Sequence, residues 1–216
     1  MKLLLITLSA IIGCVLSDSN HTVTQEAWFE VEVKDLDGPG QDYTGRFVIG
    51  LFGDAAPMTA LNFASITKGY KKGRDNLQYK NTPVHRIVPD FVIQMGDITR
   101  GDGSGGRSIF GERFNDEEFI LSHKAPGFVA MANHGPDTNN SQFYILLTKA
   151  RWLDRKHVVF GKVVRGFDVV ETMGEVPADP YTAVPKKRVK IIDCGINELD
   201  EKYELTDEQI MGTADI

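Results

Sequence analysis

The fold class is decided by two stretches, AWFEVEVK at residues 27–34 and GRFVIGLF at residues 45–52. In the first, apolar and charged residues alternate, which is the period of a strand with one buried face. The second is rich in β-branched and aromatic residues and is bounded by glycine, and the turn sequence DGPG at residues 37–40 lies between the two. We therefore predict an antiparallel hairpin with a long connecting loop.

Strand-like runs separated by Gly, Pro, Asn and Asp continue outward from this hairpin. They are TPVHRIV (82–88), DFVIQMGD (90–97), GFVAMAN (127–133), SQFYILLT (141–148), KHVVFGKVV (156–164) and RVKIIDC (188–194). A helix is predicted from Pro57 to Tyr70, with proline at its start and Gly69 near its end, and a second from Gly166 to Met173. This pattern is typical of a mainly β domain, either a barrel or a sandwich.

The composition indicates one ordinary globular domain. The chain has 216 residues, of which 42% are hydrophobic and 25% charged, enough to bury a substantial core. The formal net charge is -6 and the pI about 5.4, so no overall basic field attracts phosphate groups. We therefore do not expect nucleic acid as a partner.

The first 17 residues, MKLLLITLSAIIGCVLS, have the layout of a secretory signal peptide. Lys2 precedes an apolar run from Leu3 to Leu16 that is short for a membrane span, and cleavage is predicted after Ser17. Two alternatives stay open, a buried strand or helix and a bacterial lipoprotein signal ending at Cys14. Removal of the signal would leave a mature chain without a transmembrane anchor.

Three further features of the sequence concern the mature chain after entry into the secretory pathway. Cys194 would be the only cysteine left, so the mature chain could form no internal disulfide. Asn20 in NHT and Asn139 in NNS are candidate glycosylation sites, although a plain turn residue is an equal alternative for Asn139. After residue 196 the chain is acidic, and we expect a solvated, mobile tail over residues 197–216.

Several kinds of site are disfavoured by their surroundings. GDGSGG at residues 101–106 satisfies the GxGxxG pattern, but the strand-like SIFGERF (108–114) follows it where a dinucleotide site needs a helix. We interpret these glycines as a loop that needs unusual backbone angles or close approach of another chain. The histidines are scattered without ligand spacing, so no metal site is predicted. A GxSxG nucleophile motif is absent from the sequence.

Four runs together resemble the cyclophilin family of peptidyl-prolyl isomerases, whose secretory branch the chain resembles through its signal peptide. They are HRIVPDFVIQMGD (85–97), TRGDGSGG (99–106), MANHGPDTNNSQF (131–143) and WLDRKHVVFGKV (152–163). The resemblance covers residues 27–196, between a signal peptide (1–17) with a short N-terminal segment (18–26) and the acidic tail (197–216). It implies a closed eight-stranded antiparallel β-barrel capped by two α-helices.

The resemblance also implies a set of functional residues. Arg86, Gln94 and Asn133 match the catalytic positions of the family: the arginine donates to the proline, the glutamine binds substrate backbone and helps place the arginine, and the backbone of Asn133 grips the peptide. The implied substrate-binding residues are Phe91, Val92, Ala132, His134, Gln142, Tyr144, Trp152, Leu153 and His157. Amide rotation requires no cofactor, and His157 is assigned to shaping the pocket because no proton is transferred.

This chain departs from the family at five of the matching positions. Val92 replaces a methionine, which would leave the proline pocket slightly wider, and Tyr144 replaces a phenylalanine, so its hydroxyl must find a partner if buried. His134 stands where alanine is usual, beside the groove for residues that precede the proline. Asp90 and Asn140 replace glycines. We therefore predict an active isomerase that is slow or selective.

The predicted partners are proline-containing polypeptides in the endoplasmic reticulum lumen or outside the cell. Trp152 would also favour cyclosporin binding, and we expect a monomer. Two other classes stay open at this point. One is a weakly catalytic or non-catalytic chaperone or scaffold that holds proline-rich segments in the same groove. The other is an extracellular structural or calcium-binding protein, suggested only by the acidic tail.

Overall fold

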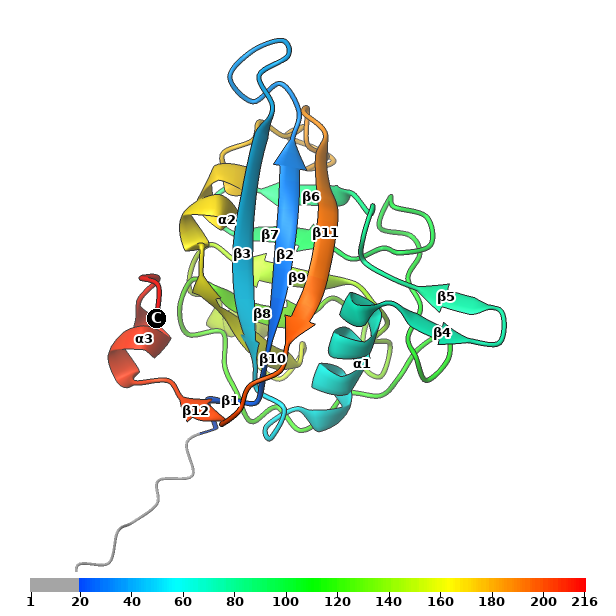
Figure 1. Ribbon diagram of the computed structural model, residues 1–216, viewed down its shortest axis with the longest axis vertical. Coiled ribbons are helices and arrows are strands. Elements are labelled where there is room, and N and C mark those ends of the chain that lie inside the picture. The colour runs from blue at the N-terminus through cyan, green and yellow to red at the C-terminus, as the bar shows by residue number, and fades with distance from the viewer. Residues whose placement is uncertain (1–19) are drawn as a thin grey trace, which may run out of the picture.

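The predicted hairpin is the longest antiparallel pair of the structure, a computed structural model that describes residues 20–216 (Figure 1). Strand β2 (Gln25–Val33) pairs along its whole length with β3 (Tyr43–Leu51), and Phe29 lies opposite Phe47. Along β2 every second residue from Ala27 to Val33 is buried, as the alternation in the sequence predicts. The predicted signal peptide and its cleavage site lie outside the described residues.

Eight strands form one sheet that curls into a nearly closed barrel. Besides β2 and β3 these are β6 (Val84–Val88), β7 (Val92–Met95), β8 (Phe128–Met131), β9 (Phe143–Leu146), β10 (Val159–Arg165) and β11 (Val189–Asn197). Their order is β11-β2-β3-β10-β8-β9-β7-β6, with antiparallel neighbours. The outer strands approach each other where Pro83 bridges Lys190 and the Asn81 N–H donates to the Ile191 carbonyl at 2.8 Å. The barrel alternative of the sequence is therefore confirmed.

Aromatic side chains fill the interior of this barrel. Phe29 stacks on Phe47 with ring centroids 5.4 Å apart, and Phe63 meets Phe143 edge to face at 4.9 Å. These rings are fully buried and belong to one continuous cluster. A packed interior leaves no room for a ligand, so a binding site must lie on the outer face of the sheet.

The two predicted helices are confirmed as α1 (Pro57–Lys68) and α2 (Phe167–Gly174), which Figure 1 shows toward opposite ends of the barrel. The carboxylate of Glu117 accepts the backbone N–H groups of Met58 and Thr59 at 2.9 and 2.6 Å, which satisfies the free donors of the first turn of α1. Gly69 ends α1 in a left-handed conformation, as its position in the sequence indicates.

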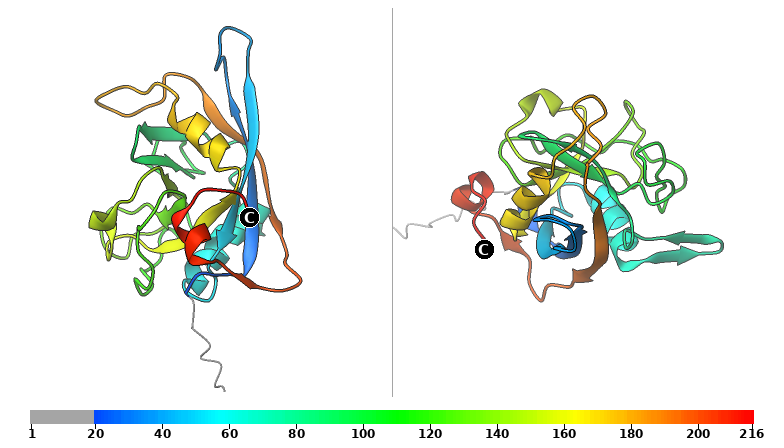
Figure 2. Two further views of the ribbon diagram at one scale, coloured as in Figure 1. Left: turned by 90° about the vertical axis from the view of Figure 1, so that its left-hand side faces the viewer. Right: turned by 90° about the horizontal axis from the view of Figure 1, so that it is seen from above.

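The expectation of a solvated tail is wrong. Residues Tyr203–Glu204 form β12, which pairs with β1 (Thr22–Val23), and Asp207–Met211 form the short helix α3. Figure 2 shows this segment lying against the outside of the barrel. Leu205 and Ile210 are 5% and 4% exposed, because both pack into an apolar cluster on the outer face. We call residues 199–216 the C-terminal strap.

The predicted strand SIFGERF is also wrong, since its residues make only isolated bridges. The preceding glycine-rich loop is held instead by the carboxylate of Asp97, which accepts the backbone N–H groups of Thr99, Arg100, Gly103 and Gly105. Burial would raise the pKa of Asp97, but these donors outweigh it and hold the pKa well below its ordinary value.

Close approach of another segment explains one glycine of this loop. Gly103 has a φ of +90°, and a Cβ there would lie 2.8 Å from Cδ2 of His85. The unusual backbone angle predicted for the loop is confirmed, and the close neighbour at Gly103 is His85 of the same chain and not another chain.

The remaining elements are small. They are the ribbon β4 (Tyr70–Lys72) with β5 (Asp75–Leu77) and one 3-10 turn, η1 (Arg151–Leu153). Cys194 lies half-buried on β11 with its Sγ 3.4 Å from the Thr67 carbonyl, and burial raises its pKa to about 11, so the thiol is unreactive. Within residues 20–216 we find no helix long and apolar enough to cross a membrane.

Candidate functional site

The β6–β7 hairpin brings Arg86 and Gln94 side by side. They are direct cross-strand partners, so their side chains leave the same face of the sheet. The tight turn between the strands contains Asp90, whose φ of 58° lies in the left-handed region. An aspartate therefore adopts here a left-handed conformation that glycine reaches at lower cost.

A chain of amide hydrogen bonds fixes the orientation of Gln94. Its Nε2 donates to Oε1 of Gln142 at 3.0 Å, and Nε2 of Gln142 donates to the carbonyls of Gly103 and Gly105 at 2.8 Å each. Since the Nε2 group of Gln94 points to Gln142, its Oε1 is the atom available to a neighbouring donor. The glycine-rich loop thus supports the polar side of the site.

Nine of the twelve predicted site residues line one outer-face cavity of about 140 Å³, formed by Arg86, Phe91, Val92, Gln94, Ala132, Asn133, Tyr144, Leu153 and His157. Arg86 and Gln94 supply its polar side, and the aromatic and aliphatic side chains supply an apolar wall. Val92 is 3% exposed and forms part of that wall, as expected from the resemblance. A cavity of this kind can bind a small apolar group beside the guanidinium of Arg86.

The three other predicted residues surround this cavity. Gln142 supports Gln94 from behind. Trp152 is 61% exposed on the rim and stacks on Phe91 with ring centroids 5.7 Å apart. His134 is exposed in a separate depression of about 190 Å³ that it shares with Arg113 and the buried Asn140.

The side chain of Asn133 is occupied in fixing its own loop. Its Nδ2 donates to the Lys156 carbonyl at 2.8 Å, and its Oδ1 accepts the backbone N–H of Gly135 at 3.3 Å. The loop therefore meets the cavity at a fixed place, and the backbone of Asn133 is left to meet a bound chain.

His157 stays neutral at ordinary pH. Burial lowers its pKa, and its Nδ1–H donates to the carbonyl of Met131 at 3.0 Å. The ring stands edge-on to Tyr144 at 5.5 Å. His157 thus contributes a flat face to the lining of the cavity.

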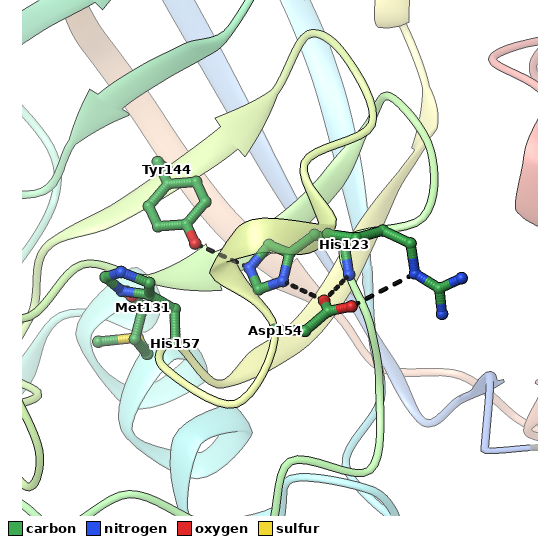
Figure 3. A network of polar contacts seen from close by, with 6 residues as sticks. His123, Met131, Tyr144, Asp154 and His157 are labelled. Carbon is green, nitrogen blue, oxygen red and sulfur yellow. Dashed lines mark hydrogen bonds and ion pairs between the residues drawn. The ribbon is translucent and has the colours of Figure 1, made fainter.

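Tyr144 turns its hydroxyl away from the cavity. Figure 3 shows the hydroxyl pointing to the ring of His123, whose Nε2 lies 2.8 Å away, while Nδ1 on the other side lies 2.9 Å from the carboxylate of Asp154. Burial raises the pKa of Tyr144, so the phenol remains protonated. The sequence predicted that the hydroxyl needs a partner, but it gave no indication that His123 and Asp154 provide it.

The two sequons differ in exposure. Asn20 is exposed just before β1. Asn139 is fully buried, and its Nδ2 donates to Asp116 at 2.7 Å. A glycan on that nitrogen is incompatible with this packing, so the prediction of a glycan at Asn139 is corrected; the residue forms an isolated β-bridge with Phe114 and is not a turn residue either. Within residues 20–216 no cluster of three or more His, Cys, Asp or Glu side chains could hold a metal ion.

Comparisons with known proteins agree with this geometry. Residues 37–196 match the family model described as cyclophilin type peptidyl-prolyl cis-trans isomerase/CLD. The chain is 46% identical over 180 residues to "Peptidyl-prolyl cis-trans isomerase CYP21-1" of Arabidopsis thaliana, covering 82% of this chain and 77% of that protein. It is 43% identical over 187 residues to "Peptidyl-prolyl cis-trans isomerase B" of Saccharomyces cerevisiae, covering 85% of each.

Proposed function

Because this chain belongs to the cyclophilin family of peptidyl-prolyl cis-trans isomerases, we propose that it accelerates rotation about X-Pro bonds in polypeptides of the secretory pathway and so assists their folding. The observation that carries the proposal is the single cavity in which Arg86 and Gln94 face an apolar wall. A proline ring fits the wall, and its amide fits the polar side.

Amide resonance is what the site must weaken. Rotation about an X-Pro bond faces a barrier of roughly 18 to 20 kcal/mol because the nitrogen lone pair is delocalised into the carbonyl. When Arg86 donates to the proline nitrogen, it holds the lone pair on nitrogen and stabilises the twisted amide. A permanently charged guanidinium suits this role because it donates at any physiological pH.

The other polar groups hold the chain on either side of the rotating bond. Gln94, oriented by Gln142, presents its Oε1 to a substrate N–H or to the guanidinium of Arg86. The backbone of Asn133 grips the peptide on the opposite side. Since no covalent bond to the substrate forms or breaks, positioning and electrostatic stabilisation account for the whole reaction.

Tyr144 supports an active enzyme over a non-catalytic scaffold. The scaffold alternative rested on altered pocket residues, and a polar tyrosine was one of them. Since the hydroxyl is taken up by His123, Tyr144 offers the proline its ring. The wall is then as apolar as one built with phenylalanine.

The role of Arg86 is tested by cis-to-trans exchange on a short X-Pro peptide. Arg86→Ala should lower kcat about 100-fold while peptide affinity changes less than about threefold, because the bond to the proline nitrogen strengthens in the transition state. Arg86→Lys should recover only part of the loss, because a lysine has no planar fork. Equal losses in kcat and affinity would contradict this role.

The secretory compartment is supported by the signal-like first 17 residues and by the exposed sequon at Asn20. Cleavage after Ser17 would leave β1 intact. Expressed in a eukaryotic cell, the secreted or lumenal protein should begin at Asp18 and lose mass on glycosidase treatment. Asn20→Gln should abolish the mass loss and Asn139→Gln should not. A cytosolic product that retains Met1 would refute the compartment and leave the isomerase assay unaffected.

Cyclosporin is proposed as a ligand because the exposed indole of Trp152 stands on the rim beside Phe91. Inhibition of peptide exchange by cyclosporin, weakened by Trp152→Ala, is the expected result. If cyclosporin inhibits Trp152→Ala as strongly as the unmodified protein, Trp152 does not contact the ligand.

A further inference from the structure

A buried polar chain lies directly behind the apolar wall of the proline site. It runs from Asp154 through His123 to Tyr144 and joins segments that are 21 and 31 residues apart in the sequence (Figure 3). We propose that His123 is a positioning residue of the isomerase. It keeps the proline pocket apolar by accepting a hydrogen bond from the Tyr144 hydroxyl, and it anchors the rim of the pocket through its hydrogen bonds to Asp154.

The contacts of His123 define its tautomer. Nδ1 lies 2.9 Å from a carboxylate oxygen of Asp154, an acceptor, so Nδ1 carries the proton. Nε2 is then the acceptor of the ring, and the Tyr144 hydroxyl at 2.8 Å is its donor. Asp154, Tyr144 and the ring of His157 at 6.5 Å are the ionisable groups that face His123. Burial lowers the pKa of His123, which favours this neutral form.

His123 also fixes the rim. Its backbone N–H donates to the same Asp154 oxygen at 2.7 Å, and its carbonyl accepts the N–H of Ala150 at 2.9 Å. These two bonds bracket η1, which carries Trp152 and Leu153. The ring of His123 is 0% exposed, so it has no substrate contact and acts only through its neighbours.

The hydrogen bonds of His123 differ from those that orient the groups acting on the amide, although Tyr144 is the cross-strand partner of Gln94. Gln94 is oriented by Gln142 and Gln142 by the glycine-rich loop, and within residues 20–216 the side-chain hydrogen bonds of His123 go to Asp154 and Tyr144 and not to this set. A change at His123 should therefore loosen ground-state and transition-state binding alike, which raises KM and leaves kcat nearly unchanged. The proposal rests on the isomerase activity and is independent of the cellular compartment.

Two substitutions at position 123 separate the two bonds of the ring. In His123→Asn the short amide can still donate to Asp154 but cannot reach Tyr144, so a buried hydroxyl loses its acceptor and turns toward the pocket or water. In His123→Gln the longer amide places an acceptor near the position of Nε2. We expect KM for an X-Pro peptide to rise about tenfold in H123N and less than about threefold in H123Q, with kcat within about threefold in both.

Rescue by a second substitution distinguishes this role from simple support of the fold. Tyr144→Phe keeps the ring and removes the hydroxyl that needs an acceptor, so the KM of H123N/Y144F should match that of Y144F alone within about threefold. A mere packing defect at position 123 would persist whichever ring stands at 144. Failure of the rescue, or equal KM values for H123N and H123Q, would overturn the proposal.

A spectroscopic measurement on the unmodified protein tests the inference without any variant. Nitrogen NMR of the His123 ring should show a protonated Nδ1 and an unprotonated Nε2 near neutral pH, and Y144F should shift the Nε2 signal. A protonated Nε2 in the neutral ring would refute the direction of the hydrogen bond and with it the proposal. This readout remains decisive if H123N does not fold.

Discussion

Ile210→Ala tests whether the C-terminal strap is part of the folded unit. Ile210 is 4% exposed in α3 and packs into the outer-face cluster. Truncation of a buried isoleucine to alanine costs about 2 to 5 kcal/mol. The low end applies because α3 is a single short turn that can settle into part of the cavity. We therefore expect a loss of about 2 kcal/mol in the free energy of unfolding.

The assay is urea denaturation, with the neighbouring Met211→Ala as the matched control. Met211 is 56% exposed on the same helix, so its truncation should change stability by less than about 0.5 kcal/mol. For a chain of this size a loss of 2 kcal/mol corresponds to a Tm lower by about 4 to 8 °C. Equal effects of I210A and M211A would show that the strap detaches without cost and would refute the packing argument.

Two further predictions concern protonation and backbone strain. Burial lowers the pKa of His85, His123 and His157, so below about pH 6.5 the unfolded chain binds protons that the folded chain does not, and stability should fall as pH decreases. The urea midpoint should therefore be lower near pH 5.5 than near pH 7.5, and equal midpoints would contradict this view of the three histidines. Asp90→Gly should raise the free energy of unfolding by about 0.5 kcal/mol. Glycine removes the cost of a φ of 58°, but part of this gain is lost because glycine loses more conformational entropy on folding than aspartate does. A lower melting temperature for D90G would mean that the aspartate side chain stabilises the turn.

Local sequence patterns predicted the secondary structure correctly where it depends on burial of one face or on the backbone of a single turn. Residue alternation predicted β2 and β3 because one face of each is buried, and proline and glycine marked the ends of α1 because they act on the backbone of their own turn. The same reasoning failed for SIFGERF and for the C-terminal strap. In the strap, Leu205 and Ile210 are isolated among acidic residues, and only the apolar outer face of the barrel makes them core residues.

The sequence by itself predicted which residues gather at the candidate site, since Arg86, Gln94, Asn133 and the predicted pocket residues lie in continuous runs that resemble one family, and nine of the twelve line one cavity. Only the tertiary structure decided what two side chains do. Tyr144 meets His123, 21 residues away, and Asn139 meets Asp116, 23 residues away. The fold decides whether a hydroxyl points into a pocket and whether an amide reaches solvent. A buried polar group turns toward the hydrogen-bond partner that the fold places near it, because leaving the group unpaired costs free energy.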